Sequence, residues 1–182
     1  MARDRALVER ARAGGPDARP AFTELVEAHQ SWLVRHLLYL LGGHAVAEDV
    51  AQEALVRAFV SLSSLEDGAK FKPWLRQIAS RLAFNRRRDE NTRREYETRS
   101  VEGRKREDSG KKAERRAIET NLVHQGLTKL SYPYREILVL YYVEELPIRE
   151  ISESLEIGMS AAKMRLSRAR SDLKAALVDL EK

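Results

Sequence analysis

Hydrophobic residues recur with the period of an α-helix along most of the chain, and the alternation typical of β-strands is absent. The longest apolar stripe runs from Phe22 to Leu41 and stops at Gly42–Gly43, a pair that predicts the end of a helix. Most prolines and glycines lie between such helical patterns. The pattern therefore predicts an all-α protein.

The helical pattern weakens between Asp89 and Arg116. Of these 28 residues, 18 are charged (ten basic, eight acidic), and only Tyr96, Val101 and Ala113 are apolar. Such a segment cannot bury a core, so we expect it to be disordered or at most a frayed, solvated helix. The prediction is two small helical domains joined by a charged flexible linker: a tail over 1–18, a domain over 19–88, the linker over 89–116 and a second domain over 117–182.

The second domain contains a helix–turn–helix pattern from Pro147 to Leu173, with a break at Glu156–Gly158. After the break, one stripe is apolar and is expected to be buried: Ala162, Leu166, Ala169 and Leu173. The opposite face and its flanks carry three cations, a serine and a methionine: Lys163, Arg168, Arg170, Ser167 and Met164. A cationic outer face of this kind suits the DNA major groove. A solvated amphipathic helix at the end of a bundle would show the same pattern.

In the first domain, an amphipathic stretch follows the paired glycines. Its inward positions are expected to be Ala51, Ala54, Leu55, Ala58 and Phe59. On the opposite face, the spacing i, i+3, i+4 and i+7 brings together Asp49, Gln52, Glu53 and Val56. This face is either solvated or a docking surface for a basic helix. The carboxylates have no nucleophile or cation arranged beside them, so the pattern does not favour acid–base catalysis.

A polar loop, Ser61–Phe71, precedes a further helical pattern that starts near Pro73, a residue suited to a first helical turn. The buried stripe is expected to contain Leu75, Ile78, Ala79 and Leu82. The other side carries Gln77, Arg81, Phe84 and Arg88. An exposed aromatic ring among arginines, beside a flexible loop, suits stacking on unpaired bases. The alternative is that Trp74 and Phe84 pack on neighbouring helices.

Composition narrows the classes of function. The net charge of +5 is compatible with a polyanionic partner, and the absence of cysteine excludes disulfides and thiolate metal sites. His29 and His36 lack further ligands at metal spacing, so we expect them to be packed in the core without a metal or cofactor. No apolar run approaches membrane-spanning length, and the N-terminus lacks a secretory signal. A cytoplasmic protein that does not insert into membranes is expected.

Three stretches, in this order, resemble the signature segments of bacterial RNA polymerase sigma factors: DVAQEALVRAF, KFKPWLRQIASRLAFN and LPIREISESLEI…KMRLSRARSDL. More narrowly, the chain resembles the extracytoplasmic-function group, whose members have only the second and fourth conserved sigma domains. The resemblance covers about residues 21–88 and 122–180. Departures include Glu156, where a small turn residue is usual, so that the turn would be either adjusted or shifted toward Gly158. A second departure is Arg81, where Asn is frequent.

The resemblance implies a transcription initiation factor, not an enzyme, whose partners are core RNA polymerase and promoter DNA. The face formed by Asp49, Gln52, Glu53 and Val56 would dock on a basic coiled coil of the polymerase clamp. The loop and the following helix would capture and open the −10 element, through Ser63, Ser64, Lys70, Phe71, Trp74, Gln77, Arg81, Phe84 and Arg88.

By the same resemblance, the second domain would read the −35 element through Lys163, Met164, Ser167, Arg168 and Arg170, and residues around Leu138–Val143 would pack on the polymerase flap. An anti-sigma factor that covers these faces is a further partner the resemblance allows, and we expect a monomer when no partner is bound. Two other classes stay open: a DNA-binding regulator independent of polymerase, and a protein-interaction module. A helical enzyme lacks support, because no phosphate-binding glycine loop or metal cluster is visible.

Overall fold

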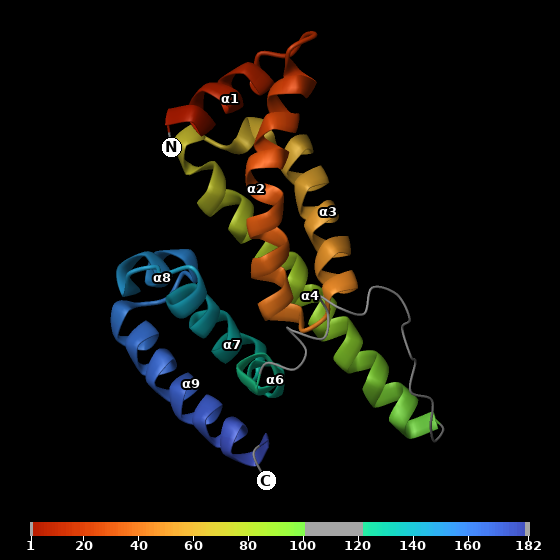
Figure 1. Ribbon diagram of the computed structural model, residues 1–182, viewed down its shortest axis with the longest axis vertical. Helices are drawn as coiled ribbons and strands as arrows, with labels where there is room; N and C mark the ends of the chain where they lie inside the picture. Colours follow the sequence, from red (N-terminus) through yellow and green to blue (C-terminus); the bar gives the residue numbers. More distant parts are fainter. Residues whose placement is uncertain (1, 101–121, 181–182) are drawn as a thin grey trace. The chain divides into compact units, whose positions relative to one another are not determined.

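The computed structural model describes the backbone of residues 2–100 and 122–180, and the side chains of residues 2–90 and 122–180. Within these residues every regular element is a helix (Figure 1), so the all-α prediction is confirmed. Contacts divide the chain into two compact units. The N-terminal unit comprises Met1–Leu38 and Gly43–Leu82, and the C-terminal unit comprises Tyr39–Gly42 and Ala83–Lys182.

The N-terminal unit is a bundle of helices with two short 3₁₀ turns. It contains α1 (Ala2–Arg12), α3 (His44–Val60), η1 (Leu62–Ser64) and η2 (Gly68–Lys70), together with most of α2 (Ala18–Leu41) and the first part of α4 (Phe71–Ser100). The ring of Phe22 on α2 lies 4.9 Å from that of Phe59 on α3 and 6.4 Å from that of Phe71 on α4, measured between centroids. These aromatic contacts join the three long helices around a core that includes Leu25, Leu33, Leu37, Ala54, Leu75 and Ala79.

The predicted helix end at the paired glycines is confirmed. Helix α2 ends at Leu41, and Gly42 has a φ of 86°, in the left-handed region that a glycine adopts without steric strain. Helix α3 starts at His44, immediately after Gly43 in extended conformation. The reversal therefore takes only two residues, and the acidic face of α3 follows directly from it.

The expectation of an N-terminal tail over residues 1–18 is wrong for most of that segment. Residues Ala2–Arg12 form α1, and Leu7, Val8 and Ala11 are buried. The segment carries only these three inward apolar positions, and an isolated helix of this length is marginal in water. Its order therefore depends on tertiary packing, which the local sequence pattern does not display.

The charged segment after residue 88 is helical for its first part, because α4 continues to Ser100. The backbone of residues 89–100 is thus helical, which is one of the two options predicted for this segment. The rest of the predicted linker, residues 101–116, lies outside the described residues.

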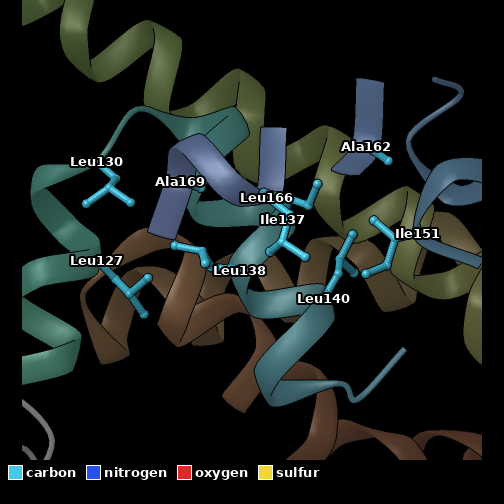
Figure 2. Packing of buried hydrophobic residues seen from close by; sticks show 9 residues of the cluster. All are labelled: Leu127, Leu130, Ile137, Leu138, Leu140, Ile151, Ala162, Leu166 and Ala169. Carbon is cyan, nitrogen blue, oxygen red and sulfur yellow. The ribbon is translucent and has the colours of Figure 1, made fainter. Parts of the chain in front are cut away.

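The C-terminal unit contains α6 (Leu122–Lys129), α7 (Tyr132–Leu138), a π-helical turn η3 (Val139–Val143), α8 (Ile148–Ser154) and α9 (Met159–Leu180). Figure 2 shows its core, which gathers side chains from all five elements: Leu127, Leu130, Ile137, Leu138, Leu140, Ile151, Ala162, Leu166 and Ala169. Helices α6 and α9 approach closely at Gly126, where an added Cβ would lie 3.0 Å from Leu173 Cδ1 and Leu177 Cδ2. None of the helices in the described ranges is long and apolar enough to cross a membrane.

Candidate nucleic-acid and protein interfaces

The helix–turn–helix is formed by α8, a four-residue turn and α9, as the sequence predicts. Glu156 supplies the left-handed turn residue, with a φ of 53°, so the turn is not shifted toward Gly158. The amide of Ile157 donates to the Ser152 carbonyl at 3.1 Å, and Ser152 Oγ donates to the Ile157 carbonyl at 2.8 Å. These two hydrogen bonds fix the direction in which α9 leaves the turn.

The two faces of α9 are oriented as its periodicity predicts. Ala162, Leu166 and Ala169 are buried in the core (Figure 2), and Leu173 is half-buried. The outer face exposes Lys163, Met164, Ser167 and Arg168. Helix α9 therefore presents two cations, a hydroxyl group and a flexible thioether on a surface that packing leaves accessible.

Arg170 differs from the other residues assigned to this face. Its guanidinium carbon lies 5.0 Å from the ring centroid of Tyr141 and 5.5 Å from that of Tyr142, which is a cation–π geometry. Tyr141 and Tyr142 belong to the π-helical turn η3. Arg170 thus links α9 to η3 at the flank of the outer face.

Helix α3 exposes the four residues predicted to form its outer face, and the exposed fraction of Val56 is 64%. Glu53 is also the acceptor of a hydrogen bond from Arg57 Nη2 at 2.6 Å, one turn further along the helix. Because this ion pair is exposed, it contributes little to stability, and a cationic partner can compete for the carboxylate.

Two further apolar side chains extend this face. Val60 is 78% exposed one turn after Val56, and Phe59, which the pattern places inward, is 44% exposed while its ring edge contacts Phe22. Val60, the last residue of α3, was not among the predicted residues of this face. The i, i+4, i+8 series Gln52, Val56 and Val60 is the signal that could have found it.

The loop between α3 and α4 is more ordered than the flexible polar loop expected from the sequence. Leu62 and Leu65 are buried, whereas Ser63, Ser64 and Lys70 are exposed. Residues that contact a ligand need such exposure. Turn η2 is capped by Asp67, whose Oδ1 accepts a hydrogen bond from the Ala69 amide at 3.0 Å. This bond, and secondly that from the Arg5 guanidinium, hold the pKa of Asp67 below its ordinary value of 3.8.

Phe71 is a correction to the predicted −10 set. Its side chain is fully buried, with its ring centroid 6.4 Å from Phe22, 5.4 Å from His29 and 6.0 Å from Trp74. In this conformation it is a core residue that DNA does not reach. The sequence does not reveal the burial of Phe71, because an apolar residue that follows a polar loop can either pack in the core or face a ligand.

The remaining −10 candidates lie on α4. Trp74 and Gln77 are half-buried, and the contact of Trp74 with Phe71 agrees with the packing alternative for part of its ring. Three other side chains, spaced by helical turns from Gln77, are exposed: Arg81, Phe84 and Arg88. His29 and His36 are buried, with His36 stacked on Trp32 at 5.8 Å between centroids. Among the described residues, no group of three potential ligands is placed to hold a metal ion.

The C-terminal unit also contains an open groove of about 500 Å³. Five apolar or aromatic residues and two cations line it: Leu138, Tyr142, Leu173, Leu177 and Val178, with Arg170 and Lys174. Leu138–Val143 is the segment that the resemblance assigns to flap binding. Within it, Leu138 and Leu140 are buried in the unit's own core, Val139 is also buried, and Tyr142 is 56% exposed. An amphipathic helix with acidic flanking residues would match this groove.

Two protein-family models match this chain, one in its N-terminal part and one in its C-terminal part. The family model for sigma-70 region 2 matches residues 25–93, and that for sigma-70 region 4 matches residues 120–173. The ECF RNA polymerase sigma factor SigW of Bacillus subtilis is 32% identical over 171 residues, which is 88% of this chain and 90% of SigW. SigM of the same organism is 31% identical over 156 residues, covering 84% of this chain and 92% of SigM.

Solved structures share the fold. The sigma factor RpoE, solved in complex with the anti-sigma factor NepR from Bartonella quintana, matches with a TM-score of 0.65 at 22% identity, over 88% of this chain and 98% of RpoE. CnrH, solved in complex with the cytosolic domain of CnrY, matches with a TM-score of 0.66 at 24% identity, over 99% of both chains. The two sigma-70 regions, in order along a chain similar to SigW over most of its length, show that this protein belongs to the ECF group of RNA polymerase sigma factors.

Proposed function

We propose that this protein binds core RNA polymerase and directs it to promoters by reading the −10 and −35 elements and assisting promoter opening. Polymerase binding and −10 recognition are assigned to residues 19–88, the linker to 89–116 and −35 recognition to 117–182. One observation carries the proposal: the same chain exposes an acidic and apolar face on α3 and a basic face on a helix–turn–helix.

The polymerase-binding surface is proposed to comprise Asp49, Gln52, Glu53 and Val56. Its carboxylates suit a basic partner helix, and its apolar edge supplies area that is removed from water on binding. Glu53 would exchange its exposed ion pair with Arg57 for one across the interface. Such an exchange costs little, because the intrahelical pair is solvated in the free protein.

For the −35 element, we assign base and phosphate contacts to the exposed residues of α9. Lys163 and Arg168 can reach phosphates or guanine edges, while Met164 and Ser167 can contact base edges in the major groove. Arg170 is assigned to the flank, where its stacking on Tyr141 and Tyr142 leaves hydrogen-bond donors of the guanidinium available for a phosphate.

For the −10 element, we assign Ser63, Ser64 and Lys70 of the loop and a continuous stripe on α4. That stripe contains Trp74, Gln77, Arg81, Phe84 and Arg88. Exposed aromatic surface can stack on an unpaired base while arginines neutralise phosphates, a combination that stabilises single-stranded DNA. Phe71 is excluded from this assignment because it is buried.

Control by an anti-sigma factor is proposed as well, since the sigma factor RpoE, which shares the fold, was solved in complex with the anti-sigma factor NepR. On this chain, the groove lined by apolar residues together with Arg170 and Lys174 suits an amphipathic partner helix with acidic flanks. A purified partner of this kind should prevent co-elution of the protein with core polymerase. Alanine at Tyr142 and Val178 should weaken that inhibition.

The proposed role requires no catalytic residue and no cofactor of the protein's own, and it places the protein in the cytoplasm with the polymerase. We also propose that the free protein is monomeric. Multi-angle light scattering of the full chain should give the mass of one chain. A stable homodimer would instead favour a free-standing DNA-binding regulator, which commonly reads two half-sites.

The decisive experiment is co-elution with purified core polymerase, followed by transcription from a pool of promoter fragments. Wild type should be compared with the double variant Gln52→Ala/Glu53→Ala. The matched control is Glu27→Ala/Gln30→Ala, which removes the same two chemical groups from an exposed face of α2. We expect the α3 variant to bind core polymerase at least about tenfold more weakly, as for two interface residues that lose roughly 1.4 kcal/mol together.

Both co-elution and specific initiation should fall in the α3 variant and persist in the control. Tight duplex binding without any affinity for polymerase would contradict the proposal and favour the free-standing regulator. Polymerase binding without promoter-dependent transcription would favour an interaction module. Equal loss in both double variants would mean that the α3 face is not the specific contact.

A further inference from the structure

Helix α1 packs on the loop between α3 and α4, which we call the reading loop and define as Leu62–Lys70. Figure 1 shows α1 lying against the yellow segment that precedes α4, and α1 contacts both 3₁₀ turns of that segment. Val8 is fully buried, and Leu7 and Ala11 are buried with it. The inner face of α1 is therefore buried within the N-terminal unit, whereas its arginines are exposed.

Two arginines of α1 anchor the two ends of the reading loop. Arg12 Nη2 donates to the Ser63 carbonyl in η1 at 2.8 Å, and Arg5 Nη2 lies 3.0 Å from Asp67 Oδ1 beside η2. The anchors are seven residues apart on α1, a separation of about 10 Å along the helix axis. A rigid helix with two such anchors restricts both 3₁₀ turns at once.

The contact of Arg5 also reaches the internal structure of the loop. The oxygen of Asp67 that pairs with Arg5 is the same one that accepts the Ala69 amide hydrogen bond. A charged donor on α1 thus holds the capping carboxylate in the orientation that closes η2. Loss of Arg5 would free this carboxylate to rotate away from the turn.

Close backbone approach provides a third, uncharged contact. Gly68 is buried, and a Cβ added there would lie 3.0 Å from both the Cα of Arg5 and the Cβ of Val8. These atoms are part of a helix and not the ends of flexible side chains, so they cannot move aside independently. A side chain at position 68 would therefore push α1 and the loop apart by a few tenths of an ångström.

Polar side chains of the loop remain accessible despite these contacts. Ser63, Ser64 and Lys70 are exposed, while Leu62 and Leu65 are buried. Contacts with α1 thus hold the loop without covering its exposed polar side chains. An arrangement of this kind lowers the conformational entropy lost when a ligand is captured.

We propose that α1 is a brace that holds the reading loop in the conformation that captures unpaired bases, with Arg5 and Arg12 as positioning residues. The inference rests on the proposed −10 function of the loop. Promoter opening would then depend on α1, although α1 carries none of the residues proposed to contact DNA.

The first test measures the loop in the free, full-length protein by amide hydrogen exchange. The probes are the hydrogen-bonded amides of Ser64, Leu65, Ala69 and Lys70. In Arg5→Ala/Arg12→Ala, their exchange should become about three- to tenfold faster, as expected for the loss of exposed charged hydrogen bonds. The matched control is Arg10→Ala, which removes an α1 arginine whose pair, Glu24, lies outside the loop. It should leave these rates unchanged.

The second test follows promoter opening by holoenzyme with a fluorescent base analogue in the −10 strand. The arginine double variant should bind core polymerase as wild type does but form about three- to tenfold less open complex. Gly68→Ala should act in the same direction without a change of charge, which separates positioning from direct phosphate contact. Arg5→Lys, which keeps the cation, should restore part of the opening. Helix content by circular dichroism must match wild type in every variant.

Unchanged exchange in both the arginine and the glycine variants would overturn the brace. Reduced opening with unchanged exchange would also overturn it, because the arginines would then act directly on DNA. If the loop amides of the variants exchange faster but their promoter opening equals that of wild type, the proposed dependence of base capture on α1 is overturned. If wild-type holoenzyme opens no promoter, the proposed function fails, and exchange alone still supports or overturns the brace.

Discussion

The two elements assigned to promoter recognition, α9 and the reading loop, obtain their shape in different ways. The outer face of α9 follows from periodicity within one helix, so its orientation needs only the stripe of Ala162, Leu166 and Ala169 to be buried. The reading loop depends on contacts with α1 that join residues 51 and 62 positions apart in the chain. A site formed by one helix can therefore be predicted from the sequence, whereas a site held in place by a helix distant in the chain cannot.

The largest expected effect tests whether the inner stripe of α9 holds the C-terminal unit together. Leu166→Ala should lower the free energy of unfolding by about 3 kcal/mol, because it removes buried methyl groups and leaves a cavity. Met164→Ala, on the exposed face, should change it by less than about 0.5 kcal/mol. Chemical denaturation of the full chain followed by circular dichroism checks both. Similar losses in the two variants would contradict the assignment of inner and outer faces.

The next effect concerns the outer face alone. Lys163→Ala/Arg168→Ala should weaken binding to −35 duplex by about 1–3 kcal/mol, and the salt dependence should flatten by roughly one unit of slope for each phosphate that is no longer neutralised. Lys174→Ala is the control, since it removes an exposed cation of α9 that lines the groove. Holoenzyme affinity measured at several salt concentrations provides the test. A control variant as weak as the double variant would show that only overall charge matters.

A smaller effect is expected at the turn that orients α9. Glu156 has a φ of 53°, which costs about 1–2 kcal/mol for a residue with a side chain, while glycine loses about 0.4–1 kcal/mol through its freer unfolded state. Glu156→Gly should therefore stabilise the protein by roughly 0.5–1 kcal/mol. Glu156→Ala keeps the strain and serves as the control. Thermal unfolding in which alanine stabilises as much as glycine would argue against relief of backbone strain.

The smallest effect tests the electrostatic link between α1 and the reading loop. The carboxylate of Asp67 should titrate below 3.8, chiefly because it accepts the Ala69 amide and secondly because Arg5 binds it. Its pKa is lower in the folded than in the unfolded state. Its contribution to stability is therefore present above about pH 4 and is lost as the pH falls through the folded-state pKa.

Carboxyl carbon NMR in wild type and Arg5→Ala measures this link. The pKa of Asp67 should rise in the variant toward its ordinary value of 3.8, because the guanidinium is lost and the carboxylate is no longer held against the Ala69 amide. Arg10→Ala should leave the titration unchanged. An identical midpoint in wild type and Arg5→Ala would mean that the guanidinium does not hold this carboxylate in solution.

The sequence by itself determined the all-α class, the helix end at Gly42, and the faces of α3 and α9. Each of these features is local, because one short segment contains its whole signal. That signal is either an apolar residue every three or four positions or a glycine where the chain reverses. The sequence did not predict helix α1 or the burial of Phe71, because both depend on the packing of segments that are far apart in the chain.

Only the tertiary structure decided the rest of the interfaces. It places Arg170 over the rings of Tyr141 and Tyr142, gives the turn conformation to Glu156 instead of Gly158, and brings Arg5 beside Asp67. Burial and charge pairing between residues far apart in the chain are properties of the packed molecule, whereas periodicity reports only on residues within a few turns of one helix.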